Sequence, residues 1–224
     1  MTSCLLFPDM APPPMFNFPE PLSDKYRPMR IAEFAGLSEP KKILTGFATS
    51  PRNCGFLFVG PAGTGKTSMG LALASEVSGF VHHVTAGNCT VDAIRQLAFA
   101  CWYVPPVGYK RHIILIDEVD LARIDAQNAL LSYLDGTNTI PDTVFVFTCN
   151  ATDRLEPRFM SRNRVLKFST YGIQEEAARL LEHVWTKEAP IGVDLPNFAR
   201  IIKEENGNVR AALATIETKL DAAR

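Results

Sequence analysis

The sequence predicts an α/β fold: a doubly wound, parallel five-stranded sheet followed by a small C-terminal domain of three helices. Three observations lead to this prediction. Short apolar runs alternate with helical patterns between Lys25 and about Phe168, and runs such as HIILI at 112–116 are typical of strands covered on both faces. A glycine-rich loop lies between one such run and a helical segment. After Phe168 the strand pattern stops and three helical stripes follow.

The expected elements follow in order along the chain. Residues 1–23 hold six of the 16 prolines and should form an extended arm, whose apolar side chains either pack on the domain or contact a partner. Residues 24–168 should form the α/β domain and 169–224 the helical domain. We expect strands at Cys54–Val59, Phe80–Thr85, His112–Ile116, Thr143–Thr148 and Arg164–Phe168, and helices around Thr67–Ser78, Thr90–Trp102 and Asp125–Leu134.

Composition narrows the class of protein. The 224 residues include 23 Lys+Arg and 24 Asp+Glu, so bulk charge gives no argument for nucleic-acid binding. Five scattered cysteines without a Cys-x-x-Cys pair favour reduced thiols over a disulfide framework or a zinc site. No apolar run approaches the roughly 18 residues of a membrane span, and no basic residue precedes Lys25. We therefore expect a cytoplasmic protein without membrane contact.

The glycine-rich loop, GPAGTGKT, matches the phosphate-loop pattern G-x-x-x-x-G-K-[ST] in its required position between a strand and a helix. Backbone amides at such a loop enclose a polyphosphate, aided by the positive end of the following helix. Lys66 would contact the β- and γ-phosphates, and the Thr67 hydroxyl would hold Mg2+. The predicted nucleotide-binding residues here are Gly60, Pro61, Ala62, Gly63, Thr64, Gly65, Lys66, Thr67 and Ser68.

Polar side chains follow two of the expected strands, those at His112–Ile116 and Thr143–Thr148. Asp117, which follows the apolar run IILI, suits the coordination of Mg2+, and Glu118 suits a base that polarises an attacking water. Asn150 follows the run TVFVFTC and is either a turn former or a hydrogen-bonding partner of the γ-phosphate or the lytic water. We favour the functional role for Asn150, because its strand should lie beside the other two.

Together these residues resemble the AAA+ ATPases, and among them the clamp-loader ATPases of the replication factor C small-subunit and phage types. The resemblance runs from about Ser23 to Arg224. Besides the phosphate loop, IDEVD and Asn150, it includes three features that go beyond a general AAA+ ATPase: the segment Lys25-Tyr26-Arg27-Pro28 with Phe34 and Gly36, the helix AQNALL at 126–131, and Ser161-Arg162.

The resemblance implies roles for specific residues. Tyr26, Arg27 and Pro28 would line the adenine pocket. Arg162 would act in trans on a neighbouring subunit's nucleotide, although Asn163 stands where the family has Cys. Arg210, in a Gly-Asn-Val-Arg segment that is similar to the family's G-D-x-R, would sense the γ-phosphate in cis. A surface salt bridge is the simpler alternative for each arginine.

The resemblance also implies partners: ATP with Mg2+, a ring or spiral of like or related subunits, a sliding clamp and primed DNA. Arg95 is the expected DNA contact, with an exposed ion pair as the alternative. The sequence holds no counterpart of the family's helical collar domain. We expect an ATP-hydrolysing, clamp-loader-like subunit that loads or remodels a protein partner on DNA in replication. The alternatives are an AAA+ motor or helicase-loader-like ATPase, and a non-catalytic ATP-binding scaffold.

An aromatic group lies near the end of the helix expected at Thr90–Trp102. Phe99, Trp102 and Tyr103 precede Pro105-Pro106, and the first two share a face that partly differs from the apolar stripe of the helix. These rings either cap the core, which is the more ordinary arrangement, or contact a partner, which in clamp loaders is the sliding clamp.

Overall fold

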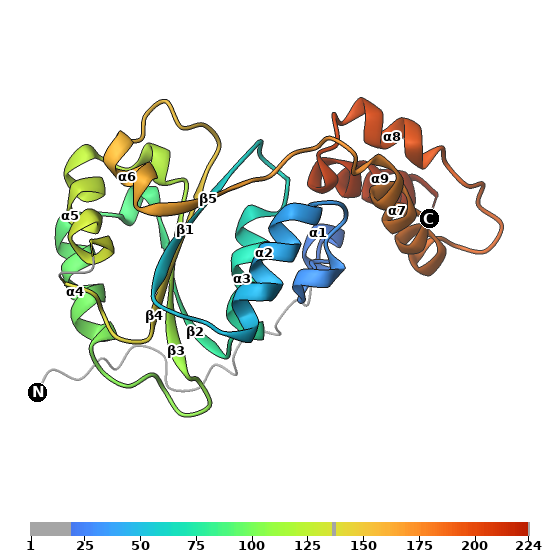
Figure 1. Ribbon diagram of the computed structural model, residues 1–224. Coiled ribbons are helices and arrows are strands. Elements are labelled where there is room, and N and C mark those ends of the chain that lie inside the picture. The colour runs from blue at the N-terminus through green and yellow to red at the C-terminus, as the bar shows by residue number, and fades with distance from the viewer. Residues whose placement is uncertain (1–18, 136–137, 224) are drawn as a thin grey trace, which may run out of the picture.

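The computed structural model describes residues 19–135 and 138–223 and contains a central sheet with helices on both faces, followed by a helical domain (Figure 1). The sheet has five strands in the order β2-β3-β4-β1-β5, and every neighbouring pair is parallel. The predicted parallel five-stranded α/β fold is therefore confirmed. The strands are β1 (Cys54–Val59), β2 (Gly79–Thr85), β3 (Arg111–Asp117), β4 (Thr143–Cys149) and β5 (Asn163–Lys167).

Two helical layers explain why the strands are apolar throughout (Figure 1). One face of the sheet packs against α4 (Val91–Cys101), α5 (Ile124–Leu134) and α6 (Pro157–Ser161). The other face packs against α2 (Ser38–Thr49) and α3 (Lys66–Glu76). Side chains alternate between the two cores along each strand, as Ile113 and Leu115 face α3 while Ile114 and Ile116 face α4 and α5.

Helix α3 lies very close to the sheet because a glycine faces the strands. A Cβ atom at Gly70 would lie 3.0 Å from Leu115 Cδ1 and 3.2 Å from Val146 Cγ1. This close packing fixes the first turn of α3 above the carboxyl ends of β1, β3 and β4, where parallel sheets bind ligands.

The C-terminal helices α7 (Gln174–Glu188), α8 (Phe198–Glu204) and α9 (Val209–Ala223) share a separate core. The short helix α1 (Leu22–Lys25) packs into this core through Leu22, and it contacts α9. Tyr26 Oη donates a 2.5 Å hydrogen bond to Glu188 on α7. The segment before the first strand is thereby attached to the C-terminal helices.

One difference from the sequence-based expectation concerns the N-terminal part. Helix α2 was not predicted, because Pro40 and Gly46 interrupt its weak stripe, yet Pro40, Leu44 and Phe47 are buried. Pro40 is tolerated because it lies in the first turn, where a helix needs no amide donor. Residues 1–18 of the predicted arm at 1–23, which include Leu5, Leu6, Phe7, Phe16 and Phe18, lie outside the described residues. Within residues 19–135 and 138–223, no helix is both long and apolar enough to span a bilayer.

Candidate nucleotide-binding site

The phosphate loop connects the end of β1 to the start of α3. Its backbone is left-handed at Gly63 (φ 76°) and Gly65 (φ 85°), a conformation that glycine adopts without steric cost. Gly65 directly precedes the first residue of α3, so the free amides of the first helical turn face the loop. The backbone therefore has the shape and polarity that an anionic ligand requires.

Lys66 lies inside this loop and is only 8% exposed. Its Nζ donates to the carbonyl oxygens of Gly60 (2.7 Å) and Pro61 (2.8 Å) and to Asn150 Oδ1 (3.0 Å). Burial lowers the pKa of Lys66, while nearby carboxylates oppose that shift. Lys66 and Asn150, predicted from separate motifs, thus meet at the ends of neighbouring strands.

Thr67 and Asp117, the two predicted Mg2+ ligands, are also in contact. Thr67 Oγ1 donates to Asp117 Oδ1 at 3.0 Å, and Thr148 Oγ1 donates to the same oxygen at 2.9 Å. A hydroxyl beside a carboxylate is an all-oxygen donor set, which fits the preference of Mg2+ for hard ligands.

Glu118 turns the chain sharply after β3. Its backbone is left-handed (φ 57°, ψ 45°), and its amide donates to Thr148 Oγ1 at 3.0 Å. The side chain is exposed rather than packed beside Asp117. This orientation leaves the Glu118 carboxylate accessible to a water molecule at the edge of the sheet.

Sequence reasoning missed two residues of the site. His83 Nε2 lies 2.6 Å from Asp117 Oδ2, and Thr148 binds both Asp117 and Glu118. Thr148 lies two residues before Asn150, in the strand already expected beside Asp117, so its place near the end of that strand is the signal that could have found it. His83 comes from β2, which pairs with β3 so that Thr85 lies opposite Asp117.

A pocket opens beside the loop, between the sheet domain and the C-terminal helices. The predicted adenine-binding residues Tyr26, Arg27 and Pro28 line it, and so does Arg210 from α9. This lining fits a nucleotide, whose base needs apolar walls and whose phosphates need donors. Its apolar walls come from Phe34, Ala35, Leu37, Ile173, Leu180, Val209 and Leu213.

Replacing Gly63 by alanine is expected to weaken nucleotide binding at least about tenfold, because a left-handed conformation costs alanine about 1–2 kcal/mol. The added Cβ would also lie 1.9 Å from Oδ1 of Asn208, at the start of α9. A titration with a fluorescent ATP analogue measures the change. Gly46→Ala is the matched control, because a Cβ there meets nothing within 4 Å; this variant should bind normally and gain about 0.5–1 kcal/mol in unfolding free energy. Unchanged affinity in Gly63→Ala would contradict the loop assignment.

Arg162 lies at the opposite edge of the sheet. The next residue, Asn163, pairs with Gly55 near the amino end of β1, whereas the phosphate loop follows the carboxyl end. The Arg162 guanidinium forms an ion pair with Asp135 and donates to the carbonyl of Arg158 at 3.1 Å. Arg162 therefore does not line the nucleotide pocket of its own chain.

The remaining predicted contacts lie on α4. Arg95 is exposed and forms a 3.7 Å ion pair with Asp92. Of the two alternatives for the aromatic group, capping the core does not hold, because Phe99, Trp102 and Tyr103 are 65%, 53% and 62% exposed. Helix α4 instead buries its smaller residues Ile94, Ala98 and Cys101, so the rings project from the end of the helix.

Comparison with known proteins agrees with this geometry. The family model described as "ATPase family associated with various cellular activities (AAA)" matches residues 56–171. The replication factor C small subunit of Thermoplasma volcanium is 28% identical over 87% of this chain and 62% of its own length. The probable replication factor C subunit 2 of Dictyostelium discoideum is 31% identical over 88% of this chain and 60% of its own length. The chain thus spans somewhat under two thirds of these relatives.

The solved structures show the same fold. The RuvB Holliday junction branch migration motor of Thermotoga maritima superposes with a TM-score of 0.70 at 20% identity, covering 85% of this chain and 64% of that one. Since the family match covers more than half of the 224 residues and includes the last part of the phosphate-loop strand, the loop and the DE pair, the chain belongs to the AAA family of ATPases.

Proposed function

We propose that the chain is a clamp-loader-like AAA+ subunit that binds and hydrolyses ATP in DNA replication. Hydrolysis would be coupled to loading or remodelling a protein partner on DNA. The main observation is that Lys66, Thr67, Asp117 and Asn150 come together at one edge of the sheet beside an apolar pocket. The replication factor C relatives support the replication role. In this proposal residues 24–168 are the ATPase core and 169–224 the lid.

Binding of the triphosphate would use groups that are already in place. The loop amides and Lys66 would contact the phosphates, and Lys66 would exchange its bonds to Gly60 and Pro61 for phosphate oxygens. Thr67 and Asp117 would hold Mg2+, directly or through water, and that ion would neutralise phosphate charge. Tyr26 and its neighbours would enclose the adenine.

Hydrolysis would be a direct attack of water on the γ-phosphate. Glu118 would accept the proton of the attacking water, and Asn150 would orient that water. Lys66 and Arg210 would neutralise the charge that develops on the phosphate oxygens in the same chain. The ADP leaving group needs no proton from the protein, because Mg2+ and these cations balance its charge.

Glu118→Gln is expected to preserve ATP binding and lower turnover about 10²- to 10⁴-fold, because an amide does not accept the proton of the water. Glutamine keeps the size of the side chain, so folding should be unaffected. Single-turnover hydrolysis measures the effect, and Glu39→Gln, an exposed position on α2, is the control. Undiminished turnover would remove Glu118 from the role of base.

The position of Arg162 supports an oligomer. Because this arginine lies at the edge of the sheet opposite its own phosphate loop, it would reach a nucleotide only in a neighbouring subunit. A head-to-tail interface between like or related subunits would place the Arg162 edge of one subunit against the phosphate-loop edge of the next. Repetition of this interface builds a ring or spiral. The isolated chain should therefore be a poor ATPase.

A single-turnover ATPase assay, with and without primed DNA and a sliding clamp, tests the proposal. A clamp-loader subunit should be stimulated by both and should capture the clamp in a pull-down. The exposed rings on α4 would contact the clamp, and Arg95 the DNA backbone. Stimulation by DNA without clamp capture would favour an AAA+ motor, to which the RuvB fold likeness also points. Absence of any hydrolysis would favour a scaffold.

A further inference from the structure

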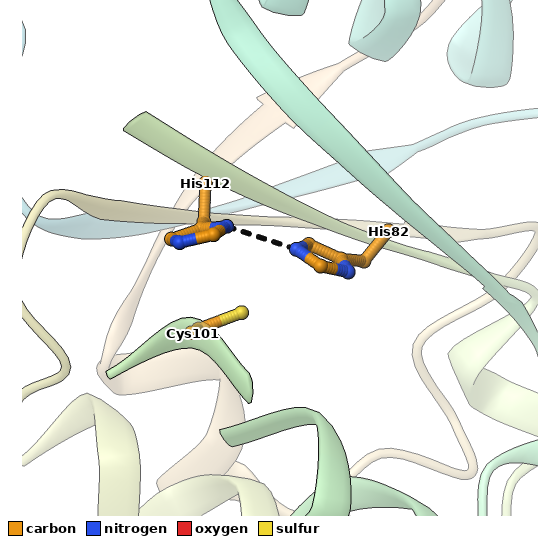
Figure 2. Close-up of side chains that lie close together, drawn as sticks. All are labelled: His82, Cys101 and His112. Atoms are coloured by element: carbon orange, nitrogen blue, oxygen red, sulfur yellow. Dashed lines mark hydrogen bonds between the residues drawn. The ribbon is translucent and has the colours of Figure 1, made fainter. Parts of the chain in front are cut away.

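Three potential metal ligands from separate elements lie together (Figure 2). His82 comes from β2, His112 from β3 and Cys101 from the last turn of α4. One ring nitrogen of each histidine and the Cys101 Sγ atom all lie within 4.8 Å of one another. His112 is the second residue of β3, whereas Asp117 is the last, so this cluster is separate from the nucleotide site. We propose that His82, Cys101 and His112 form a binding site for Zn2+.

The distances fit that ion after a small adjustment. Zn–N bonds of about 2.0 Å and Zn–S bonds of about 2.3 Å in a tetrahedron place the donor atoms roughly 3.3–3.6 Å apart. His82 Nε2 and His112 Nδ1 face each other at 2.9 Å. Binding would therefore separate the rings by a few tenths of an ångström and draw the sulfur closer.

His112 makes the kind of hydrogen bond that is typical of histidines that bind metals. Its Nε2 lies 2.9 Å from the carbonyl oxygen of Tyr103. A carbonyl oxygen accepts but never donates, so His112 Nε2 carries the proton and Nδ1 accepts a hydrogen bond from His82 Nε2. On metal binding His82 would carry its proton on Nδ1 instead, which leaves both facing nitrogens as ligands. Histidines that bind metals commonly donate their other N–H to a carbonyl or carboxylate in this way, which fixes the ring.

Burial shapes the protonation of the cluster. Cys101 and His112 are 1% and 3% exposed, while His82 is half-buried and gives access from solvent. Burial, followed by the neighbouring His112, lowers the pKa of His82 and so favours the neutral ring that binds metals. Burial also raises the pKa of the Cys101 thiol to about 12, so a divalent ion would have to displace its proton.

The donor set selects among ions. Two imidazoles and one thiolate suit Zn2+, whereas Mg2+ prefers oxygen. Three protein ligands leave a fourth position for water. The ion would attach the last turn of α4 to β2 and β3, directly before the exposed Trp102 and Tyr103. Its role would be to hold this aromatic segment in a fixed position.

Cobalt titration of the full chain, first freed of metal by a chelator, tests the proposal. We expect one Co2+ per chain with a thiolate-to-cobalt absorption band, displaced by stoichiometric Zn2+ but not by excess Mg2+. Co2+ held by Thr67 and Asp117 would give no such band, because that site has no sulfur. Cys101→Ser should abolish the band, and His82→Gln should weaken binding at least about tenfold. Cys89→Ser, another buried thiol, and His183→Gln should leave it unchanged.

Thermal unfolding gives a second measurement of Zn2+ binding, and it requires neither an absorption band nor ATPase activity. Zn2+ at a hundredfold excess over its dissociation constant should raise the melting temperature by roughly 5–10 °C in the wild type and in His183→Gln, but not in His82→Gln. If Cys101→Ser fails to fold, His82→Gln carries the test, because that side chain is half-buried. The proposal is overturned if the thiolate band is missing, if it persists in Cys101→Ser, or if His82→Gln binds Co2+ as tightly as the wild type.

Discussion

Replacing Arg162 by alanine is expected to lower assembly-dependent ATP hydrolysis by about 10³-fold while each chain keeps its affinity for ATP. The reason is positional: Arg162 pairs with Asp135 at the edge of the sheet opposite the phosphate loop, so its charge would serve a neighbour's γ-phosphate. Steady-state hydrolysis, measured over a range of protein concentrations, gives the rate. A titration with a fluorescent ATP analogue gives the affinity.

Arg158→Ala is the matched control for this variant. Arg158 is exposed on the same short helix, and it receives the hydrogen bond of Arg162 through its backbone carbonyl, which alanine retains. This control should hydrolyse ATP at the wild-type rate. Loss of ATP affinity in Arg162→Ala would indicate a role in cis, and a normal rate would remove Arg162 from the mechanism.

Lys66→Ala should weaken ATP binding by about a hundredfold or more. A hydrogen bond to a charged group contributes about 1.5–3 kcal/mol, and the Lys66 ammonium has three donors positioned inside the loop. The fold should survive, because a buried cation whose pKa is lowered by burial gives little stability of its own. Calorimetric titration with ATP and Mg2+ measures the loss.

Lys42→Ala, an exposed lysine on α2, is the control for Lys66→Ala and should bind ATP normally. The melting temperatures of both variants show whether they are folded. If Lys66→Ala binds ATP with wild-type affinity, the phosphates do not lie in this loop, and the proposed nucleotide site is wrong.

Much of the site could be predicted because it consists of strand ends. Parallel strands bring their carboxyl ends to one edge of the sheet, so Lys66, Asp117 and Asn150 were expected to meet from their motifs alone. The observed contact between Lys66 and Asn150 follows from this rule once β1 and β4 are neighbours. The apolar runs predicted the strands equally well, because both faces of the sheet are covered.

Contacts that depend on register, or on the position of β2, were not predicted. Thr148 reaches Asp117 through the register of β3 and β4, and His83 reaches it because β2 is the other neighbour of β3; no local pattern encodes either feature. The cluster of His82, Cys101 and His112 likewise needs the pairing of β2 with β3. Cysteine spacing favoured reduced thiols over a zinc site, but spacing in the sequence carries no information on side chains that the fold brings together.

The exposure of the aromatic group also required the structure. The sequence showed that Phe99 and Trp102 lie partly off the apolar stripe of α4, but large rings near a helix end more often pack on the core. In this chain Ile94, Ala98 and Cys101 fill that space, and the rings point outward. The buried residues lie at helical spacing on one stripe, so the periodicity of α4 separates them from the exposed rings.

Mixing two inactive variants shows whether ATP is hydrolysed between subunits. Arg162→Ala retains the loop that binds ATP, and Lys66→Ala retains the arginine that a neighbour needs. In an equal mixture about a quarter of head-to-tail interfaces would combine an intact loop with an intact arginine. If hydrolysis occurs between subunits, the mixture should regain hydrolysis in that proportion, each variant alone should stay inactive, and the wild-type rate per chain should rise with concentration. An inactive mixture, or a wild-type rate per chain independent of concentration, would contradict hydrolysis between subunits.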